Sequence, residues 1–334
     1  MPESILNWGI QLILSLQSLS DWLVGPMEAF TFLGNEDFFL LLFPFLYWCI
    51  DSRLGIRIGV YLVISLGLNT LLKAAWHAPR PYWFDPRVKL LTGAESSFGI
   101  PSGHAQNSVV IWSGIAAQSR RGWGWTVAVV LAFLIGFSRI YLGVHFPTDV
   151  LTGWVLGVVV LALAIWLEKP VMDWIRKFGA WEKVSIFFAL SLGFILLNVL
   201  IIQSVNGSFT VPAAWVETAG LVAEEPIAPL SPSGMITTMA AAFGFISGVV
   251  WLETRGGFDA RGTWWVRAGR LLVGLAGVLG LRYGLDAVFD LIAVDESLLG
   301  YILRYIRYGT IGFWMAALAP LVFIRLKLAH ARSE

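Results

Sequence analysis

The chain has 334 residues, of which 57% are hydrophobic and only 13% are charged, and its mean hydropathy is +0.74. Soluble domains carry about 25% charged residues, so this composition excludes an ordinary soluble protein and indicates a polytopic membrane protein. The net charge of +1 gives no reason to expect a nucleic acid as a partner. The single cysteine, Cys49, excludes an intrachain disulfide framework.

The first half of the chain contains several apolar stretches of the kind that cross membranes, for which about 20 residues are needed. Residues 5–24 are apolar but carry Asn7, Gln11, Gln17 and Asp21, and we interpret them as a first span, with a helix lying in the membrane interface as the alternative. Further spans are expected at 37–50, 56–76, 102–118, 123–141 and 147–167. A polar loop, residues 77–101, separates the third span from the fourth.

A charged segment, residues 168–183, interrupts this pattern and marks the predicted boundary within the chain. Four more apolar stretches follow, at about 184–204, 233–252, 266–289 and 301–325. The predicted fold is therefore all-α, a polytopic membrane helix bundle. It consists of a six-span core (1–167), a charged cytoplasmic linker (168–183) and a four-span C-terminal extension (184–334).

The distribution of basic residues predicts the orientation in the membrane. With ten spans the two termini share a side, and fifteen of the 23 Lys and Arg residues fall on it. The positive-inside rule makes that side cytoplasmic. The outer face then carries the 77–101 loop, the 139–149 turn and an acidic loop at 205–232 with Glu217, Glu224 and Glu225. If residues 5–24 do not cross, nine spans remain and the shared outer placement is unchanged.

The first chemistry-bearing patch comprises Lys73 and Arg80, at the end of the third span and just beyond it. Two cations at this spacing can converge on one dianion, because Arg offers a planar fork to phosphate oxygens and Lys a point charge. The alternative is interfacial anchoring, since basic residues near span ends commonly extend toward water.

The second patch is Pro101-Ser102-Gly103-His104, which opens the fourth span. A helix N-terminus with free N–H groups is a ready anion site, and Gly103 permits a close approach of a ligand. His104 adds a titratable group. The alternative is a capped helix with an interfacial histidine.

The third patch lies between the fifth and sixth spans and contains Arg139, His145 and Asp149. Pro147 suits the first turn of a helix, which places Asp149 one turn from His145. The carboxylate can then accept a hydrogen bond from Nδ1–H of the imidazole and leave Nε2 free to attack. The alternative is an interfacial arginine with a capping aspartate.

The three patches together have the order K-x6-R-P, P-S-G-H and S-R-x5-H-x3-D. This pattern resembles the signature of the type 2 phosphatidic acid phosphatase superfamily, which also includes vanadium haloperoxidases and bacterial acid phosphatases. The resemblance covers about residues 30–167. The six-span layout is similar to the integral-membrane branch, which includes bacterial undecaprenyl-diphosphatases.

The resemblance implies a role for each matching position. His145 is expected to be the nucleophile that forms a phosphohistidine, Asp149 to orient it, and His104 to protonate the leaving group and then activate water. The phosphate oxygens are expected to be held by the remaining members of the set, Lys73, Arg80, Arg139, Ser102 and Gly103. The resemblance implies neither a metal nor a cofactor.

Residues outside the three patches have interpretations that are not catalytic. His77 is interpreted as a spacer or a substrate-loop residue, and Tyr82 and Trp83 either border a lipid entrance or belong to an interfacial belt. In the extension, small residues such as Gly244 and Gly248 favour close helix packing, as a scaffold or as the surface of a homodimer. Arg282 and Asp286, four residues apart, are expected to pair with each other.

The leading functional hypothesis is a metal-independent lipid phosphate phosphatase with its site on the outer face of the cytoplasmic membrane. The substrate is expected to be polyprenyl diphosphate or a lipid phosphate such as phosphatidic acid, phosphatidylglycerol phosphate or a sphingoid phosphate. Two alternatives remain open, a lipid phosphotransferase using the same phosphohistidine and a non-catalytic lipid-phosphate carrier. The sequence does not choose among the lipids or give the role of the extension.

Overall fold

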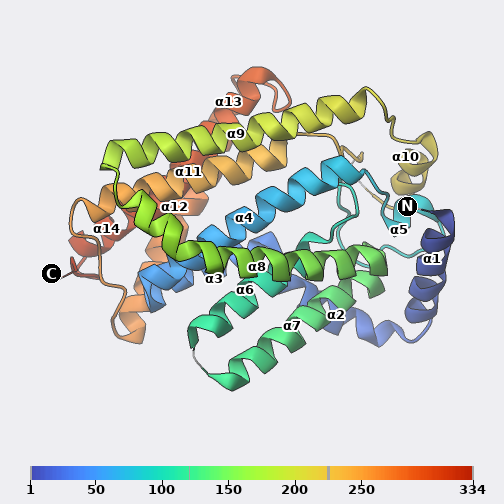
Figure 1. Ribbon diagram of the computed structural model, residues 1–334, viewed down its shortest axis with the longest axis horizontal. Coiled ribbons are helices and arrows are strands. Elements are labelled where there is room, and N and C mark those ends of the chain that lie inside the picture. Colours follow the sequence, from blue (N-terminus) through green and yellow to red (C-terminus); the bar gives the residue numbers. More distant parts are fainter. Residues whose placement is uncertain (1, 120, 224–225, 333–334) are drawn as a thin grey trace. The chain divides into compact units, whose positions relative to one another are not determined.

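Figure 1 shows the computed structural model, which describes residues 2–119, 121–223 and 226–332, the side chains of Glu36 and Asp37 excepted. Predictions that involve Arg120, Glu224 and Glu225 therefore lie outside the described residues.

The described chain is helical, and no β-strand occurs within it apart from one isolated bridge. The predicted all-α class is confirmed. The helices run in chain order as α1 (Glu3–Gln17), η1 (Asp21–Leu23), α2 (Val24–Phe32), α3 (Glu36–Phe45), η2 (Leu46–Ile50), α4 (Ser52–Trp76), α5 (Pro81–Phe84), α6 (Gly103–Ser119), α7 (Gly122–Tyr141), α8 (Pro147–Ile175), α9 (Ala180–Asn206), α10 (Ala213–Gly220), α11 (Ser233–Glu253), α12 (Trp264–Phe289), α13 (Leu298–Phe313), η3 (Trp314–Leu318) and α14 (Ala319–Arg325).

Seven of the helical segments in the described chain are long and apolar enough to cross a membrane, which confirms a polytopic membrane bundle. They begin at Ser52, Gly122, Pro147, Ala180, Ser233, Trp264 and Leu298. The predicted count of ten is not confirmed. The other three predicted spans correspond to shorter helices: α1 has 15 residues, the apolar helix 38–50 is also short, and α6 has 17. At about 1.5 Å per residue these are shorter than a hydrocarbon core of about 30 Å.

Helix α1 ends at Gln17 instead of continuing to residue 24, and the side chain of this last residue contacts two distant segments. Its Nε2 donates to the carbonyl oxygens of Lys89 (2.8 Å) and Tyr141 (3.0 Å), and its Oε1 accepts from the N–H of Lys89 (3.1 Å). A buried amide needs such partners. Gln17 therefore joins the 77–101 loop to the end of α7.

The chain divides into two compact units whose segments alternate along the sequence. Unit 1 comprises residues 1–39, 64–164 and 198–231, and unit 2 comprises 40–63, 165–197 and 232–334. This division differs from the predicted boundaries at 167 and 184. Helix α8 continues to Ile175 and α9 begins at Ala180, so most of the predicted linker is helical. Segment 198–231 of the predicted extension belongs to unit 1.

The core of unit 1 joins segments that are distant in the sequence. Its buried side chains come from α1, α5, the 77–101 loop, the turn after α7, the start of α8 and α10, and include Ile10, Trp83, Phe98, Phe146 and Ala219. Helices α6 and α7 pack as a hairpin, α2 packs on α7, and α10 packs on α5 (Figure 1). The three patches singled out in the sequence are thereby anchored in one core.

Unit 2 uses its small residues for close packing within the chain. A Cβ atom at Gly244 of α11 would lie 1.9 Å from the carbonyl oxygen of Gly309 on α13, and one at Gly248 would lie 2.8 Å from the Cβ of Ala316. Gly274 on α12 is similarly covered, by the ring of Trp48. The predicted close packing is confirmed as contact between helices of one chain, and the homodimer stays a prediction.

The expected pair of Arg282 with Asp286 is wrong. Asp286 on α12 forms its ion pair with Arg307 of α13, while the guanidinium of Arg282 lies 5.8 Å from the ring centre of the adjacent Tyr283. Arg307 is 5% exposed, and a buried cation requires a counter-charge more than a half-exposed one does. The buried arginine therefore has the aspartate as its partner.

Candidate active site

Lys73 and Arg80 are positioned by the end of α4 and the start of α5. Helix α4 ends at Trp76, and His77 adopts a left-handed backbone with φ of 37° that turns the chain. Arg80 then caps α5, whose first residue is Pro81. Lys73 Nζ donates to Ser97 Oγ (2.9 Å), and Arg80 Nη2 donates to the same oxygen (3.0 Å). Ser97 therefore bridges the two cations.

Arg80 is fully buried and ties the 77–101 loop to the turn after α7. Its Nε donates to the carbonyl oxygen of Ser97 (2.6 Å) and its Nη2 to that of Phe98 (3.2 Å). Its Nη1 donates to the carbonyl oxygen of Val144 (3.0 Å) and contacts His145 Nε2 (3.2 Å). A guanidinium with this many fixed partners is rigid and pre-organised.

The turn between α7 and α8 presents His145 to Arg80. Gly143 has φ of +80°, which glycine adopts without strain, and the carbonyl oxygen of Arg139 accepts the N–H groups of Val144 and His145 (3.2 Å each). Asp149, in the first turn of α8, accepts from the N–H of Phe146 (2.9 Å) and contacts His145 Nδ1 (3.2 Å) through the same Oδ2. The predicted spacing of imidazole and carboxylate thus produces the predicted contact.

The partners of the His145 ring determine its tautomer. Arginine has only donors, so Nε2 must be the unprotonated nitrogen that accepts from Arg80, and Nδ1 must carry the proton that Asp149 accepts. Burial, with the positive charge of Arg80, holds the pKa of His145 well below its usual range. The imidazole is therefore neutral near pH 7, with its Nε2 lone pair directed to the cationic side of the site.

The Pro-Ser-Gly-His segment opens α6 against α8. Ser102 Oγ accepts from the N–H of Ala105 (3.4 Å), a capping contact, and the N–H of Ser102 donates to the carbonyl oxygen of Asp149 (3.0 Å). The amide of Ser102 therefore already has an acceptor, and the expected part of Ser102 in phosphate binding stays a prediction. The N–H groups of Gly103 and His104 have no acceptor within the described part of the chain, so the predicted anion site at this helix start would rest on them.

His104 is half-buried, and its ring makes no hydrogen bond to any described residue. The charged groups near it are Arg139, Glu95, Lys73 and Arg80, the same ones that form the cluster around His145. A Cβ at Gly34, after α2, would lie 3.2 Å from His104 Cδ2 and 2.7 Å from Ile135. Only glycine fits between them, so α2 approaches the imidazole closely.

Glu95 is a site residue that the sequence analysis missed. Its Oε2 accepts from Arg80 Nη2 (2.5 Å) and its Oε1 pairs with Arg139 Nη2, while Arg139 Nη1 donates to Thr31 Oγ1 (2.6 Å). Burial raises the pKa of Glu95, but the charges of Arg80, Arg139 and Lys73 outweigh burial and hold that pKa well below its usual range. The carboxylate thus joins the two arginines that were expected to hold phosphate.

A signal for Glu95 was present in the sequence. The 77–101 loop contains two acidic residues, and Asp85 pairs with Arg87 two positions later (2.7 Å). Glu95 was then the one loop carboxylate left to balance Lys73, Arg80 and Arg139.

Five of the predicted site residues form one connected cluster. Lys73, Arg80, Arg139, His145 and Asp149 are joined by direct contacts or through Ser97 and Glu95. Ser102 joins through the backbone of Asp149, and Gly103 and His104 follow it at the start of α6. No group of three or more His, Cys, Asp or Glu side chains among the described residues has an arrangement that could hold a metal ion.

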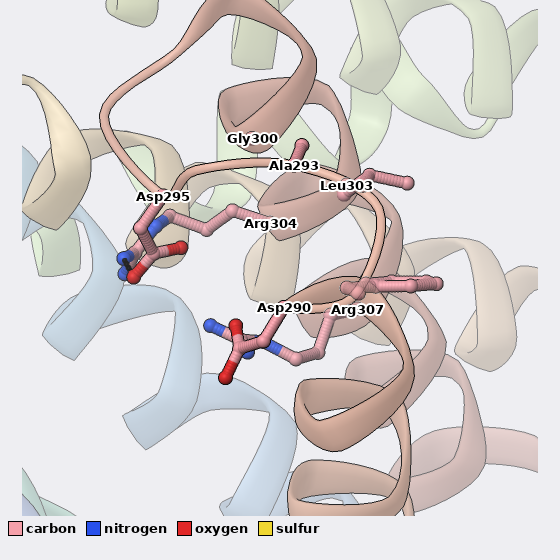
Figure 2. A pocket seen from close by; sticks show the side chains of 8 residues that line it. Asp290, Ala293, Asp295, Gly300, Leu303, Arg304 and Arg307 are labelled. Carbon is pink, nitrogen blue, oxygen red and sulfur yellow. Dashed lines mark hydrogen bonds and ion pairs between the residues drawn. The ribbon is translucent and has the colours of Figure 1, made fainter.

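A separate polar cavity lies in unit 2, between the end of α12 and α13 (Figure 2). It has room for about one water molecule, with a volume of about 10 Å³. Arg304 on its wall donates to Asp295 (2.6 Å), and Arg307 is paired with Asp286. Both arginines are in ion pairs, and no histidine or cysteine is among the lining residues, so the cavity does not offer the chemistry of the unit 1 cluster.

The fold and the cluster define a class, a helical membrane protein whose neutral histidine is backed by a carboxylate and surrounded by cations. Residues 54–172, which include every predicted site residue, match the PAP2 superfamily, and residues 236–331 match the PAP2 superfamily phosphatase, transmembrane extension. Phosphatidylglycerophosphatase B of Bacillus subtilis is 31% identical over 169 residues, which cover 47% of this chain and 80% of that protein. The chain belongs to the PAP2 superfamily.

Other relatives match over smaller parts of their length. Lipid phosphate phosphatase delta of Arabidopsis thaliana is 28% identical over 57% of this chain and 48% of that protein. Undecaprenyl-diphosphatase of Sulfolobus acidocaldarius is 30% identical over 35% of this chain and 56% of that protein. The chain thus spans about half the length of these two relatives. The crystal structure of a Bacillus subtilis phosphatidylglycerolphosphate phosphatase is 26% identical, with a TM-score of 0.45, over 51% of this chain and 89% of that one.

Proposed function

We propose that this protein is a metal-independent membrane phosphatase that hydrolyses lipid phosphate or diphosphate esters through a phosphohistidine. The observation that carries the proposal is the His145 ring, whose Nδ1 contacts Asp149 Oδ2 (3.2 Å) and whose Nε2 contacts Arg80 (3.2 Å). This is the tautomer that a nucleophilic imidazole requires, placed beside cations that attract the phosphoryl group.

The first chemical step follows from this geometry. Nε2 of His145, released from Arg80 Nη1, attacks the terminal phosphorus and the P–N bond forms. The bond from this phosphorus to its leaving oxygen breaks, which is the lipid oxygen in a monophosphate and the bridging oxygen in a diphosphate. His104 enters this step as the imidazolium, and the leaving oxygen takes its proton. Asp149 stabilises the positive charge that develops on the ring, and Arg139 and Lys73 stabilise the phosphoryl oxygens once Glu95 has released its arginines.

The second step returns the protein to its starting state. His104, now neutral, takes a proton from water, the water oxygen attacks phosphorus and the P–N bond breaks. Inorganic phosphate leaves and Nε2 regains its lone pair. Atoms and protons balance, because the proton lost by His104 in the first step returns to it in the second.

The proposed substrate class is lipid phosphates, with polyprenyl diphosphate placed first and phosphatidic acid, phosphatidylglycerol phosphate and sphingoid phosphates as the other candidates. Three observations support a lipid substrate: the apolar helices, the membership in the superfamily, and relatives that are named phosphatases of lipid phosphates and of undecaprenyl diphosphate. The proposed location is the outer face of the cytoplasmic membrane, which rests on the excess of Lys and Arg on the opposite side.

The test of activity is phosphate release by the purified protein from a panel of lipid mono- and diphosphates, with and without EDTA. We expect release that EDTA does not abolish, and a loss of about 10³-fold or more in His145→Ala and His104→Ala. Equal release from all three proteins would contradict the proposal. Transfer of labelled phosphate to a lipid acceptor instead of water would establish the phosphotransferase alternative, and lipid flipping that survives His145→Ala would establish the carrier.

The test of orientation uses single cysteines in a Cys49→Ala background. Ala94 and Arg121 are both exposed, one in the 77–101 loop and the other before α7. In intact cells a membrane-impermeant thiol reagent is expected to label Ala94→Cys and to leave Arg121→Cys unlabelled until the cells are opened. The reverse pattern would place the site on the cytoplasmic face.

A further inference from the structure

The segment that follows α9 lies in the predicted extension, yet it belongs to unit 1 together with the candidate active site. Its helix α10 packs on α5, the helix that Arg80 caps (Figure 1). Ala219 of α10 is 1% exposed and shares the hydrophobic core with Tyr82, Trp83 and Phe98. The contact is therefore a packed interface within the unit that holds the phosphate-binding cluster.

The aromatic side chains of this segment reach the residues that flank the cations. The ring of Phe209 lies 4.3 Å from the ring of His77 and 6.1 Å from that of Phe98, centre to centre. His77 lies between Lys73 and Arg80 in the sequence and has the left-handed backbone described above, while the carbonyl oxygen of Phe98 accepts from Arg80. Phe209 thus touches both segments that place the two cations.

A second ring extends the same surface. Trp215 lies 6.1 Å from Phe209, and Phe98 lies 6.3 Å from Trp83, whose ring is 5.9 Å from the Arg80 guanidinium. The result is a series of aromatic rings that runs from the extension to the cationic cluster. Both Phe209 and Trp215 are only partly buried, so they retain surface that another molecule can contact.

The chemistry of this surface is apolar and lacks positive charge. Residues 205–232 contain three Glu residues and no Lys or Arg, so they offer no cation to the phosphodiester of a glycerolipid head group. Aromatic faces instead favour hydrocarbon over polar ester groups. In a prenyl phosphate the carbon that bears the phosphate is part of the hydrocarbon chain, whereas in phosphatidic acid it is part of a glycerol diester. The prenyl phosphate therefore matches the aromatic surface of Phe209 and Trp215 better.

We infer that residues 208–220 are a specificity-determining segment of the active site, and that Phe209 and Trp215 favour prenyl-type phosphates over glycerol-based ones. The inference rests on the proposed phosphatase function and assigns a role to part of the C-terminal extension. Neither residue is proposed to take part in the chemical steps.

The experiment compares three substrates: farnesyl phosphate, short-chain phosphatidic acid and p-nitrophenyl phosphate, which has no lipid chain. The variants are Phe209→Ala, Trp215→Ala and the conservative Phe209→Leu. Trp181→Ala is the matched control, because Trp181 is 85% exposed on α9 in unit 2. The value of kcat/KM is measured for each variant with each substrate, and thermal unfolding in detergent checks that each variant is folded.

In Phe209→Ala and Trp215→Ala we expect the ratio of kcat/KM for farnesyl phosphate to that for phosphatidic acid to fall by about tenfold. The kcat/KM for p-nitrophenyl phosphate should stay within about twofold of the wild-type value. The farnesyl phosphate to phosphatidic acid ratio of Phe209→Leu should lie between those of the wild type and Phe209→Ala, and the ratio of Trp181→Ala should match the wild type. An unchanged ratio, or a parallel loss on all three substrates, would overturn the inference and leave the phosphatase assignment intact. Absence of any His145-dependent hydrolysis in the wild type would overturn both.

Discussion

At the scale of single residues, the Glu95 carboxylate binds the two arginines that we propose hold the phosphate. It pairs with Arg80 and Arg139, and its side chain is 26% exposed. An entering phosphate must displace it, so part of the attraction between phosphate and the arginines is offset by the ion pairs that are lost. The Glu95 carboxylate balances one of the two arginine charges, which lowers the cost of burying Arg80 and Arg139 without a ligand.

Replacing Glu95 by Gln removes this competition while keeping the shape of the side chain. We expect inorganic phosphate, the product, to inhibit Glu95→Gln at about tenfold lower concentration than the wild type, a difference of about 1.4 kcal/mol. The measurement is the inhibition constant of phosphate in the release assay with a chromogenic ester. An inhibition constant equal to or higher than that of the wild type would show that Glu95 serves mainly to orient the arginines.

The direction of the pKa shift of Glu95 predicts that the effect of this residue on activity does not change between pH 5 and pH 9. A carboxylate whose folded pKa is held well below its usual range stays ionised throughout pH 5–9. Its stabilising effect is present above the unfolded pKa of about 4.3 and is lost as the pH falls through the lower folded value. We therefore expect the ratio of kcat/KM between Glu95→Gln and the wild type to be constant from pH 5 to 9. Taking a ratio cancels the ionisation of the substrate. A tenfold change in this ratio with a midpoint between pH 5 and 7 would show that Glu95 titrates there.

At the scale of elements, hydropathy predicted most helices well, because a long apolar run has no other stable arrangement in a membrane. It overestimated the length of α1, since composition does not reveal that the helix ends at Gln17, whose side chain binds the backbone of Lys89 and Tyr141. The contact of His145 with Asp149 was predictable because it is local and set by helix spacing. The roles of Glu95 and Phe209 depend on contacts between distant segments, which spacing within one motif does not encode.

The packing of α11 against α13 allows a prediction with a built-in control. A Cβ at Gly244 would lie 1.9 Å from the backbone oxygen of Gly309, whereas one at Gly280 of α12 meets nothing within 4 Å. We expect Gly244→Ala to destabilise the protein by about 1–3 kcal/mol, because the two helices must separate. Gly280→Ala should be neutral or slightly stabilising, because alanine is the better helix former. Thermal unfolding in one detergent compares the two. Equal unfolding temperatures for both variants would contradict the close approach of α11 and α13.

At the scale of the whole molecule, the chain order and the compact units do not coincide. The predicted extension begins at residue 184, but residues 198–231 belong to unit 1, and residues 40–63 of the predicted core belong to unit 2. Each unit therefore requires both halves of the chain. The two family matches, at 54–172 and 236–331, leave the 198–231 segment outside both, although Ala219 is buried in the core of unit 1.

This interleaving predicts that the six-span core is not independent. A chain that ends at residue 183 contains every predicted catalytic residue but lacks the segment that packs on α5. We expect it to release less than about one hundredth of the phosphate of the full chain. Helix α5, which begins after Arg80, loses its packing against α10, and the apolar surface of α5 is exposed to lipid or water. Co-expression of residues 184–334 as a separate chain should restore a large part of the activity, since helices of membrane proteins can associate after insertion. Phosphate release is normalised to the amount of each fragment in the membrane, which separates loss of activity from loss of expression. Full activity of residues 1–183 alone, at equal membrane abundance, would show that the extension is dispensable for the site.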